Sequence, residues 1–163
     1  MERLQVPFRV EAPGVDEAVT KAAGGQPQAI VEDLARQKAR AVFGRNPKAV
    51  VIGSDQAVVL EGELLDKPGS EANAKAQLQS LRGREHRLIT SVAIAHHDGL
   101  AEFTDITRLT MRELTDAEIE RYVQREQPLD CAGSYKIEGL GVALFERIDT
   151  RDHTAIVLSR SGM

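Results

Sequence analysis

Apolar residues recur with helical spacing between residues 27 and 43. Pro27 suits the first turn of a helix, and Gly44 suits its end. The apolar positions keep to one helical face: Ile30, Val31, Leu34, Ala35, Ala39, Val42 and Phe43. The preceding stretch, 21–26, carries two adjacent glycines and is expected to be a loop. The pattern therefore predicts a loop followed by an amphipathic helix.

Shorter apolar runs have the composition and the flanking turn residues of β-strands. The first run ends at Ile52, and Gly53 is expected to stop it, so that residues 54–56 form a connection. The two longest runs flank the turn sequence at 97–99 and are expected to pair as an antiparallel hairpin. The expected strands are residues 48–52, 57–60, 63–65, 88–95, 100–111 and 142–148.

Capping signals predict two more helices. Ser70 is an N-cap candidate for a helix that ends before Gly83, and Thr115 with Glu118 has the spacing of a capping box. The inward positions are Ala74, Leu78 and Leu81 in the first helix and Ile119, Tyr122 and Val123 in the second. Because helices alternate with strands and one hairpin is antiparallel, we expect an α/β fold with a mixed sheet flanked by helices.

Length and composition narrow the class of protein. The 163 residues suit one domain, and 21 basic against 25 acidic residues leave a formal charge of −4. No cluster of Lys and Arg suggests nucleic-acid binding. A single cysteine, Cys131, cannot form an intramolecular disulfide, and no apolar run approaches the roughly 18 residues of a membrane span. We therefore expect a cytoplasmic protein that binds neither nucleic acid nor membrane.

Lys38 is misplaced for a solvated residue. It lies four residues from both Leu34 and Val42, so it projects from the apolar face of the predicted helix. An ammonium group there either reaches the edge of the core with its charged end or meets an anion. The pattern leaves both interpretations open, a snorkelling side chain and a cleft lysine that contacts a phosphate or carboxylate.

Asp55 follows directly on a predicted strand, and ligands gather at the carboxyl ends of strands in α/β sheets. A carboxylate there binds a hard cation or takes a proton from water, although an Asx-turn would also explain it. Two further positions have the same ambiguity: Glu17 fits a solvated loop, and Lys67 fits a surface turn before Pro68. Together these acidic and basic groups suit a phosphate ester held through a divalent metal.

The order of these segments resembles the Maf family of nucleotide pyrophosphatases, named for an effect on septum formation. The resemblance covers nearly the whole chain and rests on Val15-Asp16-Glu17, Leu34-Ala35 with Lys38-Ala39, Val51-Ile52-Gly53-Ser54-Asp55-Gln56, Lys67-Pro68, Leu81 with Gly83 and His86, Glu118-Ile119 with Tyr122-Val123, and Cys131-Ala132-Gly133-Ser134-Tyr135 with Gly139. It implies a single domain over residues 1–163, with a twisted sheet and a cleft between two lobes as in Maf and ITPase proteins.

The resemblance also implies roles for individual residues. Asp55 would be the catalytic carboxylate that activates water, and Glu17 with Asp55 would hold Mg²⁺ or Mn²⁺. Lys38 and Lys67 would neutralise the triphosphate as charge moves onto pyrophosphate. The residues implied to contact the nucleotide are Lys38, Lys67, Gln56, Lys136 and Glu138. The family resemblance makes a homodimer the expected assembly.

Within the family the chain resembles the branch that hydrolyses 7-methyl-GTP. The pyrimidine branch carries Gly-Ala-Asp-Thr at positions 53–56 and Gly-Ile-Gln-Gly at positions 136–139, whereas this chain carries Gln56 and Glu138. N7-methylation makes guanine positive, and guanine offers N1–H and N2–H donors, so a carboxylate suits it better than an amide. Glu138 pairing with Lys136 or Arg147 is the alternative, and dTTP or UTP is the competing substrate.

Both ends depart from the family pattern. The usual Ser-x-Ser-Pro-Arg-Arg phosphate loop has no counterpart before Phe8, and the closing helix has none after Val157. Because arginine contacts orient phosphates, we expect hydrolysis by this chain to be weak or absent if the loop is truly missing. A non-catalytic protein that binds nucleotides or a cell-division partner is the alternative from another functional class.

Overall fold

A computed structural model describes residues 7–151, which form one twisted five-stranded sheet with helices at both ends. The strands follow the order β2-β1-β3-β4-β5. Their bounds are Val51–Leu60 for β1, Glu63–Leu65 for β2, Glu85–His96 for β3, Gly99–Met111 for β4 and Phe145–Asp149 for β5. The expectations for residues 1–6 and 152–163 lie outside the described residues.

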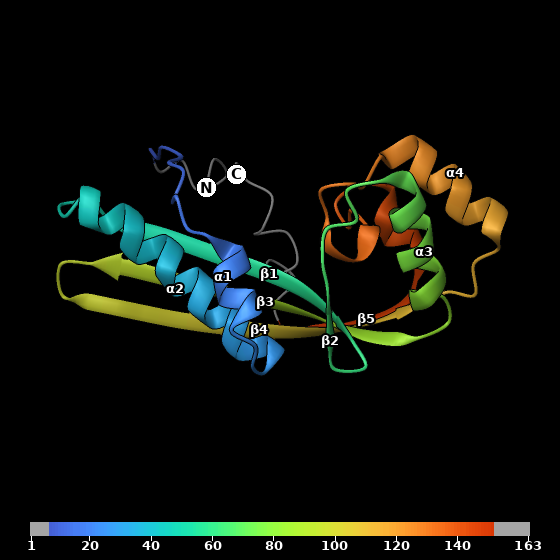
Figure 1. The fold of residues 1–163 in the computed structure, drawn as a ribbon, viewed down its shortest axis with the longest axis horizontal. Helices are drawn as coiled ribbons and strands as arrows, with labels where there is room; N and C mark the ends of the chain where they lie inside the picture. Colours follow the sequence, from blue (N-terminus) through green and yellow to red (C-terminus); the bar gives the residue numbers. More distant parts are fainter. Residues whose placement is uncertain (1–6, 152–163) are drawn as a thin grey trace.

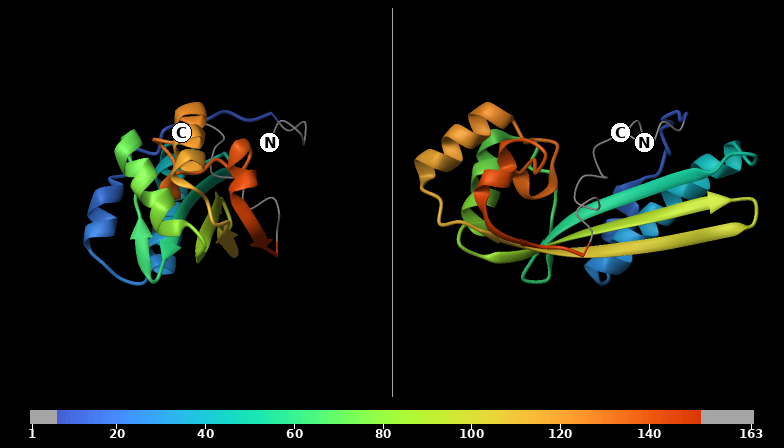
Figure 2. Two further views of the ribbon diagram at one scale, coloured as in Figure 1. Left: turned by 90° about the vertical axis from the view of Figure 1, so that its right-hand side faces the viewer. Right: turned by 180° about the vertical axis from the view of Figure 1, so that it is seen from behind.

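The helices divide the molecule into two lobes that share the sheet. In Figure 1, α1 and α2 lie along the long strands at one end, whereas α3 and α4 gather at the other end, and Figure 2 shows the same division from two further sides. The helices are Glu17–Ala22 for α1, Pro27–Arg45 for α2, Glu71–Leu81 for α3 and Asp116–Glu126 for α4. Helices on a twisted sheet confirm the α/β class and the two-lobed arrangement.

The strand directions differ from the expected mixture. Every strand pair that the structure describes is antiparallel. A parallel pair needs a crossover that carries the chain back across the sheet. The connection through α3 joins β2 to β3, which run in the same direction on opposite sides of β1, so it places no two parallel strands side by side. The chain therefore enters β3 running opposite to β1.

The two strands expected on either side of Gly53 are one continuous strand, β1, so the predicted connection at 54–56 is wrong. Gly53 is required there for packing. A Cβ atom at this position would lie 2.5 Å from the backbone nitrogen of Ala39 and 2.6 Å from the carbonyl oxygen of Ala35. Without a side chain, Gly53 lets α2 lie directly on β1. Asp55 consequently lies in the middle of a strand and not at its carboxyl end.

The capping signals are confirmed, and one helix was missed. Ser70 accepts a hydrogen bond from the Asn73 amide at the start of α3, and Thr115 with Glu118 forms the complete capping box of α4. Helix α1 occupies part of the region expected to be loop, with Asp16 as its N-cap. The last strand begins only at Phe145, because residues 140–144 form a 3-10 helix.

The larger core lies under α3 and α4, and a histidine is buried beside it. His86 is 2% exposed; its Nε2 lies 3.2 Å from the Tyr135 hydroxyl, and its ring packs beside Tyr135 and Phe145. Burial lowers the pKa of His86 from the ordinary 6.5 to about 4. The ring is therefore neutral in the folded protein at neutral pH.

We predict that this histidine weakens the fold in mild acid. The unfolded chain binds the proton at pH 6.5 and the folded chain only near pH 4, so the stability that neutral His86 contributes is complete above pH 6.5 and is lost as the pH falls towards 4. The expected loss is about 3 kcal/mol. Urea unfolding across this pH range measures it. His86→Gln should make the stability less dependent on pH. The same pH dependence in the variant would show that His86 is not the group responsible.

Candidate active site

A cavity of about 450 Å³ lies between the two lobes. Its walls come from α1, α2, β1, the segment after β2 and the loop at residues 130–138. Strand β2 pairs with β1 only at residues 58–60, so residues 54–57 line the cavity beyond the end of β2. The edge of β1 in the middle of the molecule is therefore accessible to a ligand.

Lys38 joins two carboxylates at this cavity. Its Nζ lies 2.8 Å from Oδ1 of Asp55 and 2.7 Å from Oε1 of Glu17. The Lys38 and Asp55 side chains are only 8% and 10% exposed, whereas Glu17 is 37% exposed. Lys38 is therefore the cleft lysine of the two interpretations, in contact with carboxylates, and it does not snorkel, because its charge is buried between two partners. The three groups together carry one net negative charge.

Local structure explains why these three residues meet. Lys38 lies on the buried face of α2, which Gly53 admits close to β1. Asp55 is two residues beyond Gly53 and therefore points to the same face of the sheet. Glu17 is the first residue of α1, which Asp16 caps through its side chain. The cluster thus depends on the close approach of α2 and β1.

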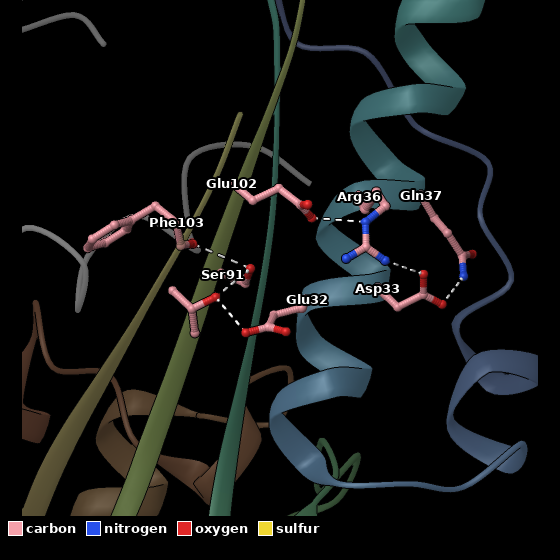
Figure 3. Close-up of polar contacts among 8 residues, drawn as sticks. Glu32, Asp33, Arg36, Gln37, Ser91, Glu102 and Phe103 are labelled. Carbon is pink, nitrogen blue, oxygen red and sulfur yellow. Dashed lines mark hydrogen bonds and ion pairs between the residues drawn. The ribbon is translucent and has the colours of Figure 1, made fainter. Parts of the chain in front are cut away.

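A second set of polar contacts fixes α2 to the sheet. In Figure 3, Arg36 extends from α2 towards Glu102 of β4, with Nε 2.9 Å from Oε1, and towards Asp33 in its own helix. Glu32 accepts a hydrogen bond from the Thr104 hydroxyl of β4 at 3.1 Å. These contacts join α2 to β4, in addition to the closer packing of α2 on β1 and β3.

The environment shifts the ionisation of all three groups in the cluster. Burial raises the pKa of Asp55 and outweighs the opposing effect of Lys38. Burial also works against the charged forms of Glu17 and Lys38, but their ionic contacts prevail. Asp55, and after it Glu17, raise the pKa of Lys38, and Lys38 lowers the pKa of Glu17. Lys38 therefore stays charged, and Asp55 is a stronger base than an ordinary aspartate.

The cavity brings together most of the residues that the sequence singled out. Glu17, Lys38, Asp55, Gln56, Lys67 and Glu138 all line it. Gln56 also donates a hydrogen bond from Nε2 to the Thr90 hydroxyl at 2.7 Å. The Lys136 ammonium lies elsewhere: it donates to the carbonyl oxygens of Glu126 and Gln127 at the end of α4, 2.7 and 3.2 Å away. A direct role of the Lys136 side chain at the nucleotide is therefore not supported.

Sequence reasoning missed Lys21 and Asp66, which also line the cavity and form an ion pair of 2.8 Å. Lys21 lies four residues after Glu17, and residues with this spacing share one face of a helix. Once α1 is known to be a helix, the spacing places Lys21 beside the cluster. The unrecognised helix is thus the reason that Lys21 was overlooked.

The donor set of Glu17 and Asp55 suits a hard cation. Mg²⁺ and Mn²⁺ prefer carboxylate oxygens and complete their coordination with water and substrate phosphates. Among residues 7–151, one group of three potential ligands lies close together, His96, His97 and Asp98 at the turn between β3 and β4, outside the lining of the cavity. Glu17 and Asp55 are among the carboxylates that line the cavity itself.

A buried carboxylate beside lysines in a polar cleft suits the hydrolysis of an anionic phosphate compound. Comparison with known families agrees with this class. The family model described as Maf-like protein matches residues 1–158, and the chain belongs to that family. No helix in the described part of the chain has the length and apolar character of a membrane span.

Similar proteins carry a common name, 7-methyl-GTP pyrophosphatase. The relative from Albidiferax ferrireducens is 48% identical over 160 residues, which is 96% of this chain and 79% of the relative. The one from a Polaromonas species is 49% identical over 159 residues, 96% of this chain and 72% of the relative. The one from Xanthomonas oryzae is 46% identical over 157 residues, 96% of this chain and 82% of the relative.

Proposed function

We propose that this protein is a nucleotide pyrophosphatase that hydrolyses the α–β phosphate bond of 7-methyl-GTP. The products are 7-methyl-GMP and pyrophosphate. The names of the relatives support the substrate. The observation that carries the chemistry is the buried Asp55–Lys38–Glu17 cluster at the wall of the cavity between the lobes.

In the proposed reaction, Asp55 accepts a proton from a water molecule as the water oxygen bonds to the α-phosphorus. The bond from the α-phosphorus to the bridging oxygen breaks, and its electron pair leaves with pyrophosphate. The raised pKa of Asp55 favours proton acceptance. Lys38, kept charged by its two carboxylates, and Lys67 stabilise the negative charge on the phosphate oxygens.

Glu17 and Asp55 are the residues that we propose to hold Mg²⁺ or Mn²⁺ together with the substrate phosphates. The cation would supply further neutralisation of phosphate charge. The fit rests on the chemistry of two carboxylates at one wall of the cavity. Gln56 lines the same wall and is proposed to contact the nucleotide.

Glu138 is proposed to recognise the base. It lies in the loop at residues 130–138, which lines the cavity together with α1 and α2. Its carboxylate would accept from guanine N1–H and N2–H and attract the positive charge of the methylated ring, whereas the base of dTTP or UTP has a single N–H donor, N3–H, and no positive charge. This proposal accounts for a preference between bases through one side chain.

A substrate panel tests the proposed function. Pyrophosphate release is measured with 7-methyl-GTP, GTP, dTTP and UTP in magnesium-containing buffer. We expect the highest kcat/KM with 7-methyl-GTP. Equal rates with all four nucleotides, or a preference for dTTP or UTP, would contradict the proposed substrate, and release from none of them would favour the non-catalytic alternative over the enzyme.

Substitution of Glu138 by glutamine tests the proposed base contact. Glu138→Gln should lower the preference for 7-methyl-GTP over dTTP by about tenfold or more, because a charge-assisted contact is replaced by a neutral one. Glu146→Gln is the control, since Glu146 lies on β5 outside the cavity. An unchanged preference in Glu138→Gln would show that another group reads the base.

A further inference from the structure

We propose that Lys21 binds the polyphosphate chain of the substrate, and that Asp66 holds this lysine at the cavity until the substrate arrives. The inference rests on the proposed function, since it concerns the same cavity. Lys21 belongs to α1, Asp66 directly follows β2, and both residues line the cavity. Their side chains are joined by an ion pair of 2.8 Å.

The charge at the cavity creates the need for such a lysine. Lys38 is already neutralised by two carboxylates at 2.7 and 2.8 Å, and the cluster keeps one net negative charge. A triphosphate that enters the cavity therefore meets a negatively charged wall. Lys21 and Lys67 are the further lysines in the cavity lining. Contacts from both would offset the repulsion between the phosphates and the cluster.

The field of Lys21 already reaches the cluster. Its charge is among the influences that lower the pKa of Glu17 and that oppose the rise in the pKa of Asp55. The ammonium is thus close enough to act on groups at the reaction centre. A phosphate bound between Lys21 and this cluster would be within the same range.

Exchange of Asp66 for phosphate would be easy. The Lys21 and Asp66 side chains are 36% and 73% exposed, and ion pairs in such surroundings stabilise a protein little. A phosphate offers more negative charge and more acceptor oxygens than one carboxylate. The substrate would therefore compete well for the Lys21 ammonium.

The attachment of α1 also allows Lys21 to change partners. None of the residues of α1 is buried, and polar side-chain contacts join it to other parts of the chain: Glu17 to Lys38, Lys21 to Asp66 and Thr20 to Gln37. Arg45 fixes the chain just before α1 by donating to the carbonyl oxygens of Ala12 and Pro13. Gly14 precedes the helix and Gly24 follows it, with φ of 69° and 74°, and no other atoms crowd either glycine.

The two halves of the ion pair give opposite predictions. Lys21→Gln should weaken binding of inorganic tripolyphosphate about tenfold, because a cation is lost. Asp66→Asn should strengthen it by about two- to fivefold, because the competitor of the phosphate is lost and the cation remains. If the pair only held α1 in place, both substitutions would loosen the same helix and change binding in the same direction.

Isothermal titration calorimetry with tripolyphosphate in magnesium-containing buffer decides between these outcomes without relying on turnover. Lys75→Gln and Glu120→Gln are the matched controls, because this ion pair of 2.9 Å is also on the surface and joins residues outside the cavity. Both controls should bind as the unmodified protein does. Opposite shifts support the proposal; shifts of the same sign, no shift, or no binding by the unmodified protein would overturn it.

The result is separate from the test of the proposed function. Pyrophosphate release from 7-methyl-GTP with same-sign shifts in tripolyphosphate binding would leave the enzyme standing and remove the role of Lys21. Opposite shifts in a protein that releases no pyrophosphate would support phosphate binding by Lys21 and contradict the proposed enzyme.

Discussion

Asp55→Asn is expected to lower kcat for pyrophosphate release by about 10²- to 10⁴-fold. The amide cannot accept the proton of the attacking water. The change also takes one negative charge from Lys38, so that the ammonium keeps only Glu17 as a carboxylate partner. Steady-state kinetics with 7-methyl-GTP measures the effect, and calorimetry with the same nucleotide shows whether binding survives.

Two further observations make this test specific. Asp149→Asn, an exposed carboxylate that pairs with Arg147 on β5, is the control and should leave kcat unchanged. In the unmodified protein, kcat/KM should fall as the pH decreases through the raised pKa of Asp55, because the protonated carboxyl group is no base. A variant with nearly full kcat would remove Asp55 from the chemistry.

Gly53→Ala is expected to be the most damaging substitution outside the charged groups. The new methyl group would lie 2.5 Å from the backbone nitrogen of Ala39. Because the clash is with backbone atoms, no change of side-chain rotamer can relieve it. Overpacking typically costs about 1–3 kcal/mol, and a clash between two backbones belongs at the upper end or beyond. Urea unfolding measures the loss.

The same substitution should impair the site, because α2 must move away from β1 and carry Lys38 from Asp55. Gly44→Ala is the matched control: Gly44 lies in α2, has open space around it, and should gain about 0.5–1 kcal/mol from the better helix former. If Gly53→Ala were as stable and active as the unmodified protein, the close approach of α2 and β1 would not be what assembles the cluster.

The features that the sequence predicted well are those with local causes. The capping box at Thr115 and Glu118, the N-cap at Ser70 and the helical periodicity after Pro27 each depend on residues within a few positions of one another. The hairpin of β3 and β4 likewise follows from two extended runs and the turn between them. Such signals need no knowledge of what packs against them.

The features that the sequence did not predict depend on tertiary contacts. Glycine is typical of turns, and only the close approach of α2 explains why Gly53 lies inside strand β1. Helix α1 has no buried residue and therefore no apolar periodicity by which to recognise it. The expected strand from 142 begins at Phe145, after a 3-10 helix that gives no periodic signal.

For the site, residue type and position indicated the chemistry but not the partners. The apolar face of its helix marked Lys38 as unusual, yet the buried contacts with Asp55 and Glu17 depend on where β1 and α1 lie. The family resemblance indicated Lys136, whose ammonium instead contacts the end of α4. The individual roles and the homodimer stay predictions, whereas membership of the family is shown.

Hydrolysis of 7-methyl-GTP in ¹⁸O-labelled water tests the central claim most directly. Attack of water on the α-phosphorus places the label in 7-methyl-GMP and leaves pyrophosphate unlabelled, and mass spectrometry of the two products distinguishes them. The proposed mechanism predicts one labelled oxygen in the monophosphate. Label in pyrophosphate would place the attack on the β-phosphorus and contradict it, as would release of inorganic phosphate in place of pyrophosphate.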